Sequence, residues 1–78
     1  MSSIRYQLLL FVETYPGLTI AEIAGALGWD QKYTRRHLDK ARVRGLLSRR
    51  DHQYALTTSG QRRLDYVREH GLVEERQS

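Results

Sequence analysis

Apolar residues recur at helical spacing near the start of the chain. Over residues 3–15 they lie mostly three or four positions apart, which predicts a helix capped by Ser2 or Ser3; the apolar set is Ile4, Leu8, Leu9, Phe11, Val12 and Tyr15. Pro16 and Gly17 end this helix, because proline interrupts the backbone ladder and glycine takes positive φ freely.

Leu10 makes the apolar arc of this first helix broader than a helix with one buried side needs. Two interpretations stay open. Either every apolar residue here is ordinary core, or the helix packs on the core with one side and on a partner with the other.

A capping pattern marks the start of a second helix, over residues 20–27. Thr19 and Glu22 form the T-x-x-E capping box, in which each residue satisfies a backbone donor of the other. Ile20, Ile23, Ala24 and Leu27 give the inward stripe. Gly28 then supplies a turn.

A longer helix is predicted from residue 31 to about residue 44, with Asp30 as its cap and Gly45 at its end. Its inward positions are Thr34, Leu38 and Ala41, with His37 at their margin, while Trp29 is expected to fill the core at the preceding turn. A short helix, a glycine turn and a longer helix rich in Arg and Lys indicate a helix-turn-helix whose second helix can lie in a DNA groove.

The next segment predicts a β-hairpin. Its strands are residues 46–50 and 53–56, and Asp51 and His52 form the tight turn between them. We expect core-facing and outward-facing positions to be divided as follows: Leu47, Tyr54 and Leu56 face the core, whereas Arg49 and Gln53 face solvent or a ligand.

A final helix begins within residues 57–60, capped by Thr58 or Ser59, and ends near His70 before Gly71. Leu64 and Val67 form its apolar stripe, with Tyr66 as a third candidate. The element order predicts a mainly α (α+β) fold, the winged helix-turn-helix: three helices, a two-stranded β-hairpin wing and a C-terminal helix. Residues 1–71 are expected to form this single DNA-binding domain and residues 72–78 a polar, flexible tail.

Two segments carry a resemblance to known regulators: PGLTIAEIAGALGWDQKYTRRHLDKARVRGLLSRR and YALTTSGQRRL. They resemble MarR, ArsR and PadR-type microbial transcriptional regulators, and the second matches their strand-to-helix signature Y-x-L-T-x-x-G. The resemblance implies DNA binding, with the third helix as the recognition helix. Family members usually append long dimerisation helices, whereas here one short helix follows the wing, and the wing itself is small.

Positive charge is concentrated in one block. The 78-residue chain has a net charge of +4, yet residues 30–50 alone carry +6, while residues 1–29 and 51–78 each carry −1. Positive charge concentrated in one segment indicates a polyanion partner such as nucleic acid. The alternative is a solvated, Arg-rich helix face.

Other functional classes find little support. The chain has no cysteine, its three histidines are scattered, and it has no Gly-rich phosphate loop, no paired carboxylates in an apolar setting and no usable catalytic triad. We therefore expect no enzyme activity, no metal and no cofactor. The apolar run at residues 8–12 is too short for a signal peptide or a membrane span, so we expect a cytoplasmic protein without a membrane partner.

The docking mode that the resemblance implies assigns candidate DNA contacts. On the third helix, base edges would be met by Gln31, Lys32, Tyr33, Arg35, Arg36 and Asp39, with Arg35 and Arg36 first because Arg pairs bidentately with guanine. Tyr33 could stack, bond a phosphate or simply cover the helix. Lys40, Arg42 and Arg44 suit general electrostatics. The wing would use Arg49, Arg50 and His52 on a minor groove or phosphates, and Thr19 would meet phosphate at the start of the second helix.

The sequence thus predicts a sequence-specific double-stranded DNA-binding protein, a transcriptional regulator acting as a homodimer through its first and last helices. The alternative is a winged-helix module for protein–protein interaction, or an accessory subunit of a nucleic-acid machine, which would use the broad apolar face of the first helix. The DNA target and any small-molecule effector are not specified by the sequence.

Overall fold

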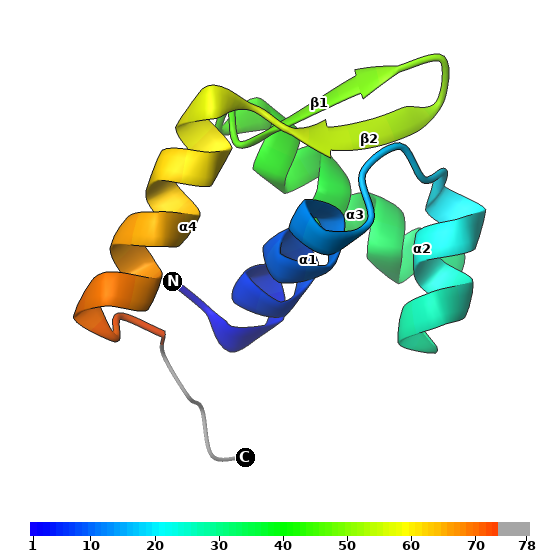
Figure 1. Ribbon diagram of the computed structural model, residues 1–78. Coiled ribbons are helices and arrows are strands. Elements are labelled where there is room, and N and C mark those ends of the chain that lie inside the picture. Colours follow the sequence, from blue (N-terminus) through cyan, green and yellow to red (C-terminus); the bar gives the residue numbers. More distant parts are fainter. Residues whose placement is uncertain (74–78) are drawn as a thin grey trace.

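Helix α1 lies at the centre of the molecule, packed against α3, α4 and the wing (Figure 1). The computed structural model describes residues 1–73. The elements are α1 (Ser3–Thr14), α2 (Ile20–Leu27), α3 (Gln31–Val43), β1 (Leu47–Arg50), β2 (Gln53–Leu56) and α4 (Thr58–His70). Every predicted element is present, with ends within one residue of the prediction. Most of the predicted tail, residues 74–78, lies outside the described residues.

Local capping explains where the middle helices begin. The Thr19 hydroxyl accepts a bond from the Glu22 N–H at 3.3 Å, and the Glu22 carboxylate accepts one from the Thr19 N–H at 3.0 Å, which completes the predicted capping box. The Asp30 carboxylate accepts from the N–H groups of Lys32 and Tyr33 and so fixes the start of α3. Both caps rest on contacts between neighbours in sequence.

The cap of α4 differs from the prediction of Thr58 or Ser59. Thr57 is the cap: its hydroxyl accepts from the Gly60 N–H at 2.9 Å and also donates to the carbonyl of Gly45. The Thr57 N–H donates in turn to the carbonyl of Leu46. Because these partners lie before the hairpin, Thr57 ties the start of α4 to the end of α3, and the helix begins one residue earlier than its own sequence indicates.

The core lies between the four helices and the base of the wing. Its buried members include Leu8, Leu9, Val12, Ile23, Leu38, Ala41, Leu47, Tyr54 and Leu64. Leu10 and Phe11 are partly buried and pack against this core, so the interpretation as ordinary core holds for both. Tyr15 follows the end of α1 and is 55% exposed, and Tyr66 is 52% exposed, so neither belongs to the core stripe. Tyr66 instead stacks on His70.

The wing is a two-residue hairpin. Asp51 and His52 both have positive φ, +51° and +67°, which is the geometry of the type I′ turn that suits the twist of paired strands. The register pairs Arg49 with Tyr54 and Arg50 with Gln53.

Directly opposed residues share one face of a hairpin and neighbouring residues lie on opposite faces. Arg49 therefore lies on the face of Tyr54, whereas Gln53 lies on the other face with Arg50. Both side chains are exposed, as predicted, although they lie on different faces of the hairpin.

Within residues 1–73, none of the helices has the length and apolar character that crossing a membrane requires.

Candidate nucleic-acid interface

Helix α3 presents its charged residues outward because its inward stripe is completely buried. Thr34, Leu38 and Ala41 each have 0% exposure, at the spacing of successive helical turns. The exposed positions include five of the predicted contact residues: Gln31, Lys32, Arg35, Arg36 and Lys40. The sequence thus placed the outward face of this helix correctly.

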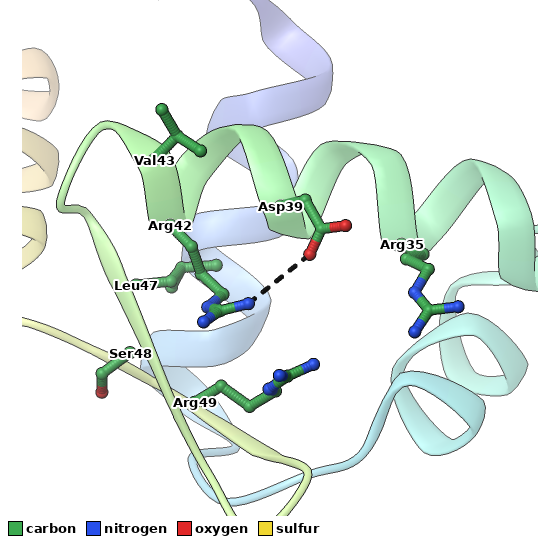
Figure 2. A pocket seen from close by; sticks show the side chains of 7 residues that line it. All are labelled: Arg35, Asp39, Arg42, Val43, Leu47, Ser48 and Arg49. Atoms are coloured by element: carbon green, nitrogen blue, oxygen red, sulfur yellow. Dashed lines mark ion pairs between the residues drawn. The ribbon is translucent and has the colours of Figure 1, made fainter.

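A groove of about 810 Å³ separates the outward side of α3 from β1. It is lined by Arg35, Asp39, Arg42, Val43, Leu47, Ser48 and Arg49. Figure 2 shows Arg35 extending from α3 and Arg49 from β1 into the same space. Asp39 is the only carboxylate in this lining and lies 3.7 Å from Arg42, so it is partly neutralised by its own helix.

A smaller hollow of about 170 Å³ adjoins this groove at the start of α2. It brings together Thr19, Ile20, Ala21, Arg35, Arg49, His52 and Tyr54. The N–H groups of Ile20 and Ala21 have no acceptor within their own helix, and the positive end of the helix dipole adds to the charge of both arginines. Four predicted contact residues from three elements, Thr19, Arg35, Arg49 and His52, thus surround one site with the chemistry to hold a phosphate group.

Tyr33 lies in an aromatic cluster rather than standing free. Its ring centroid is 5.3 Å from that of Trp29 and 4.6 Å from that of His37. Trp29 is only half-buried and packs against the margin of the core. Of the three roles left open for Tyr33, this geometry favours covering the helix.

His37 is partly shielded from water in the same cluster. Burial lowers the pKa of its imidazole, and the cations Lys40, Arg36 and Arg5 lower this pKa further. A neutral imidazole suits the packing role predicted for this residue.

The two arginines of the wing, Arg49 and Arg50, lie in different surroundings. Arg49 lines both the groove and the smaller hollow, whereas Arg50 lines neither and lies on the opposite face of the hairpin. The two adjacent arginines therefore offer a natural comparison in experiments.

Three residues near this surface were not among the predicted contacts. Val43 is 89% exposed between charged neighbours, and its position four residues after Asp39 was a helical-spacing signal for it. Arg5 and Arg63 lie beside the end of α3, in one hollow with Arg44. No local sequence pattern indicates them, because they come from opposite ends of the chain.

Among residues 1–73, no group of three or more metal-binding side chains comes together.

Comparison with known proteins gives matches of structure only. No protein-family model matches the sequence, and no curated protein matches it. Among solved structures, MepR, a transcription regulator of the Staphylococcus aureus multidrug efflux pump MepA, has a TM-score of 0.81 and 23% identity over 86% of this chain and 54% of its own. The MarR family transcription regulator SP03579 has a TM-score of 0.82 and 24% identity over 92% of this chain and 52% of its own.

The transcriptional repressor CouR, solved with p-coumaroyl-CoA, has a TM-score of 0.73 and 30% identity over 82% of this chain and 48% of its own. The chain thus spans about half the length of these proteins. The likeness confirms the predicted winged helix-turn-helix fold and the resemblance to MarR-type regulators.

Proposed function

We propose that this chain, which has the winged helix-turn-helix fold of MarR-family transcription regulators, binds double-stranded DNA and regulates transcription. In this proposal α3 enters the major groove, and the wing contacts the minor groove or the flanking phosphates. The regulators that it resembles in structure support the general role. The surface of this chain supports the DNA contacts.

The observation that carries the proposal is the uncompensated charge beside α3. Arg35, Arg36, Lys40 and Arg49 are exposed, and within residues 1–73 no carboxylate oxygen lies within 4 Å of their charged nitrogens. Such cations keep their water in the free protein and can exchange it for phosphate, which releases the counterions condensed on DNA. Arg35 and Arg49 line the groove beside the wing, and Arg36 and Lys40 line a neighbouring hollow on α3.

Different residues are proposed for base edges and for the backbone. Arg35 and Arg36, near the middle of α3, reach base edges, with Gln31 and Lys32 at the start of the helix; each bidentate contact contributes about 1–3 kcal/mol of discrimination between bases. Lys40 adds general attraction. Thr19, Arg49 and His52 hold a phosphate at the start of α2, and Arg50 meets the backbone from the outer face of the wing.

We also propose a homodimer, because one module reads few base pairs and two half-sites supply the missing selectivity. The exposed apolar residues at the ends of α1 and α4, Tyr15, Tyr66 and Leu72, are the candidates for that contact. The competing role as a protein-interaction module relied on a broad apolar face of α1. Leu10 and Phe11 pack against the core, which narrows that face.

The test is a titration of a fluorescently labelled random-sequence duplex across a series of salt concentrations. Wild-type binding should weaken steeply as the salt concentration rises, and Arg35→Ala combined with Arg36→Ala should weaken it at every salt concentration, because two cations are lost from the outward face of α3. Arg62→Ala is the control, since Arg62 is an exposed arginine of α4 outside the groove and its adjoining hollow.

Binding that ignores salt, or that survives the double substitution unchanged, would refute the proposal. A monomer that ignores DNA but captures a protein would favour the interaction-module role. Selection of bound duplexes from a random pool then addresses the dimer, because a palindromic motif is expected for two symmetric copies.

A further inference from the structure

Three arginines from separate parts of the chain converge at the end of α3. Arg5 of α1, Arg44 at the C-terminal cap of α3 and Arg63 of α4 line one hollow of about 180 Å³, together with Met1 and Leu46. The N-terminal amine of Met1 donates to the carbonyl of Leu72 at 2.9 Å, which ties the beginning of the chain to the end of α4. The packing of three helices therefore holds the arginines together.

No counter-charge inside the described protein offsets this cluster. Within residues 1–73, no carboxylate oxygen lies within 4 Å of any of these three guanidinium groups. Partial burial lowers the pKa of Arg5, and repulsion from Arg44 and Arg63 lowers it further. Like charges gathered in this way disfavour the free protein, and an anion that neutralises them would relieve that cost.

The cluster continues the basic surface of α3. Arg5 and Arg44 also line an adjoining hollow of about 510 Å³, whose remaining lining is Arg36, Asp39, Lys40 and Val43. Asp39 and Val43 in turn border the groove beside the wing. The wing and the three arginines therefore lie on opposite sides of a ridge formed by α3, with one carboxylate, Asp39, among all these lining residues.

The size and chemistry of the hollow suit one type of ligand. At about 180 Å³ it is smaller than the roughly 300–1,000 Å³ of pockets for small organic molecules. Guanidinium groups match phosphate oxygens in planar, paired hydrogen bonds. The major groove of DNA is about 12 Å wide, with a phosphate backbone along each side. This protein extends 33 by 31 by 21 Å, so a helix seated in the groove leaves both backbones within reach.

We propose that Arg5, Arg44 and Arg63 form a second phosphate site, which holds the DNA backbone on the α1 side of α3, across the major groove from the backbone held by the wing. This inference rests on the proposed DNA binding. It adds a role for residues of α1 and α4, and it makes α3 a recognition helix anchored on both of its flanks.

The experiment compares two neighbouring arginines of α4 by the same salt-dependent titration. Arg63→Gln removes a member of the cluster, and Arg62→Gln removes another exposed arginine, which lies outside it. Arg63→Gln should make the slope of log K against log salt shallower by about 1, and Arg62→Gln should leave it near the wild-type value. Because a backbone contact ignores sequence, the loss should be the same for duplexes of different sequence.

A second measurement separates binding from folding. If the arginines repel one another in the free protein, Arg63→Gln should keep or raise the Tm without DNA, while Arg62→Gln should not change it. Arg44→Gln should behave like Arg63→Gln in both measurements, since it removes the same repulsion at an exposed position.

Equal effects of Arg62→Gln and Arg63→Gln on the slope would overturn the inference, because they would mean that DNA responds to the overall positive charge of the protein and not to a site at Arg63. A lowered Tm for Arg63→Gln would also contradict it, by showing that this arginine serves packing. If the wild-type protein binds no duplex, the proposed function itself fails. If Arg35→Ala with Arg36→Ala weakens binding while Arg44→Gln and Arg63→Gln do not, the second site alone fails.

Discussion

Arginines occupy two contrasting settings in this molecule. At the contact between α1 and α4, Arg68 donates to both carboxylate oxygens of Glu13, at 2.8 and 2.9 Å, and also to Asp65. Gln61 donates to the same two carboxylates, at 2.6 and 3.0 Å. On the face of α3, by contrast, exposed arginines such as Arg35 have no such partner within residues 1–73.

The pKa values of Arg68 and Arg5 shift in opposite directions in these two settings. Hydrogen bonds to Glu13 and Asp65 raise the pKa of Arg68, and hydrogen bonds from Arg68 and Gln61 lower the pKa of both carboxyl groups. At Arg5, burial and neighbouring cations lower the pKa instead. An arginine thus stabilises the fold where a carboxylate pairs with it, and it remains available to bind an external anion where no carboxylate does.

The largest expected effect is on the stability of the fold and comes from a substitution at Gly60. Gly60 lies in α4, the helix that carries both Arg68, which is paired with Glu13, and Arg63, which has no carboxylate partner within residues 1–73. A Cβ atom at position 60 would clash with the carbonyl oxygen of Leu46 and lie 2.9 Å from its carbonyl carbon, and this backbone cannot move aside cheaply. We expect Gly60→Ala to destabilise the fold at or beyond the upper end of the roughly 1–3 kcal/mol usual for overpacking. Thermal unfolding followed by circular dichroism measures this.

Gly25→Ala is the matched control for that substitution. Gly25 lies within α2, and a Cβ there would meet nothing within 4 Å. Alanine in a helix interior is favoured over glycine by about 0.5–1 kcal/mol, so the Tm should rise. Equal losses in both variants would contradict the close approach at Gly60.

The next largest effect is on DNA binding and compares Arg49 and Arg50, which lie on opposite faces of the wing. Arg49→Gln should weaken duplex binding and make the salt slope shallower by about 1, because Arg49 lines the groove and the hollow at α2. Arg50→Gln, its neighbour on the other face, should have the smaller effect. Anisotropy titrations of both variants at several salt concentrations provide the measurement, and a larger effect at Arg50 would reverse the assigned orientation of the wing.

The smallest expected effect is a change in Tm that depends on pH, and it concerns the ion pair between Glu13 and Arg68. Glu13→Gln removes one of the two carboxylates paired with Arg68 and should lower the Tm at neutral pH by no more than about 4–8 °C, as expected for a partly exposed ion pair. The pKa of Glu13 is lower in the folded than in the unfolded protein, so its contribution is complete above the unfolded value of about 4.3. That contribution is lost as the pH falls through the folded pKa.

The difference in Tm between wild type and Glu13→Gln should therefore vanish in acid, and unfolding curves across pH 7 to about pH 2 would show it. Glu69→Gln, an exposed change on α4, serves as the control. A difference that persists at low pH would mean that the Glu13 side chain acts through packing rather than charge.

Prediction from the sequence succeeded where neighbours in the chain decide the structure. Thr19 and Glu22 complete their own cap, and Asp51 with His52 close the hairpin with two positive φ angles. It failed where a distant segment intervenes. Thr57 caps α4 because the carbonyls of Gly45 and Leu46, after the end of α3, also bind it.

The candidate site divides in the same way. Helical spacing was enough to place Arg35, Arg36 and Lys40 outward, since burial of Thr34, Leu38 and Ala41 fixes the rotation of α3 about its axis. It could not show that Arg49 and His52 line one hollow with Thr19, because that arrangement depends on how the wing lies relative to the start of α2.

The sequence by itself determined the order of elements, the caps of α2 and α3 and the block of positive charge, because these follow from residues close together in the chain. Only the tertiary structure decided which charges are paired between different helices. It matched Arg68 with Glu13, and it added Arg5 and Arg63 to the basic face although their own segments are slightly acidic overall. Electrostatic energy depends on distance in space, which the packing of α1 against α3 and α4 sets.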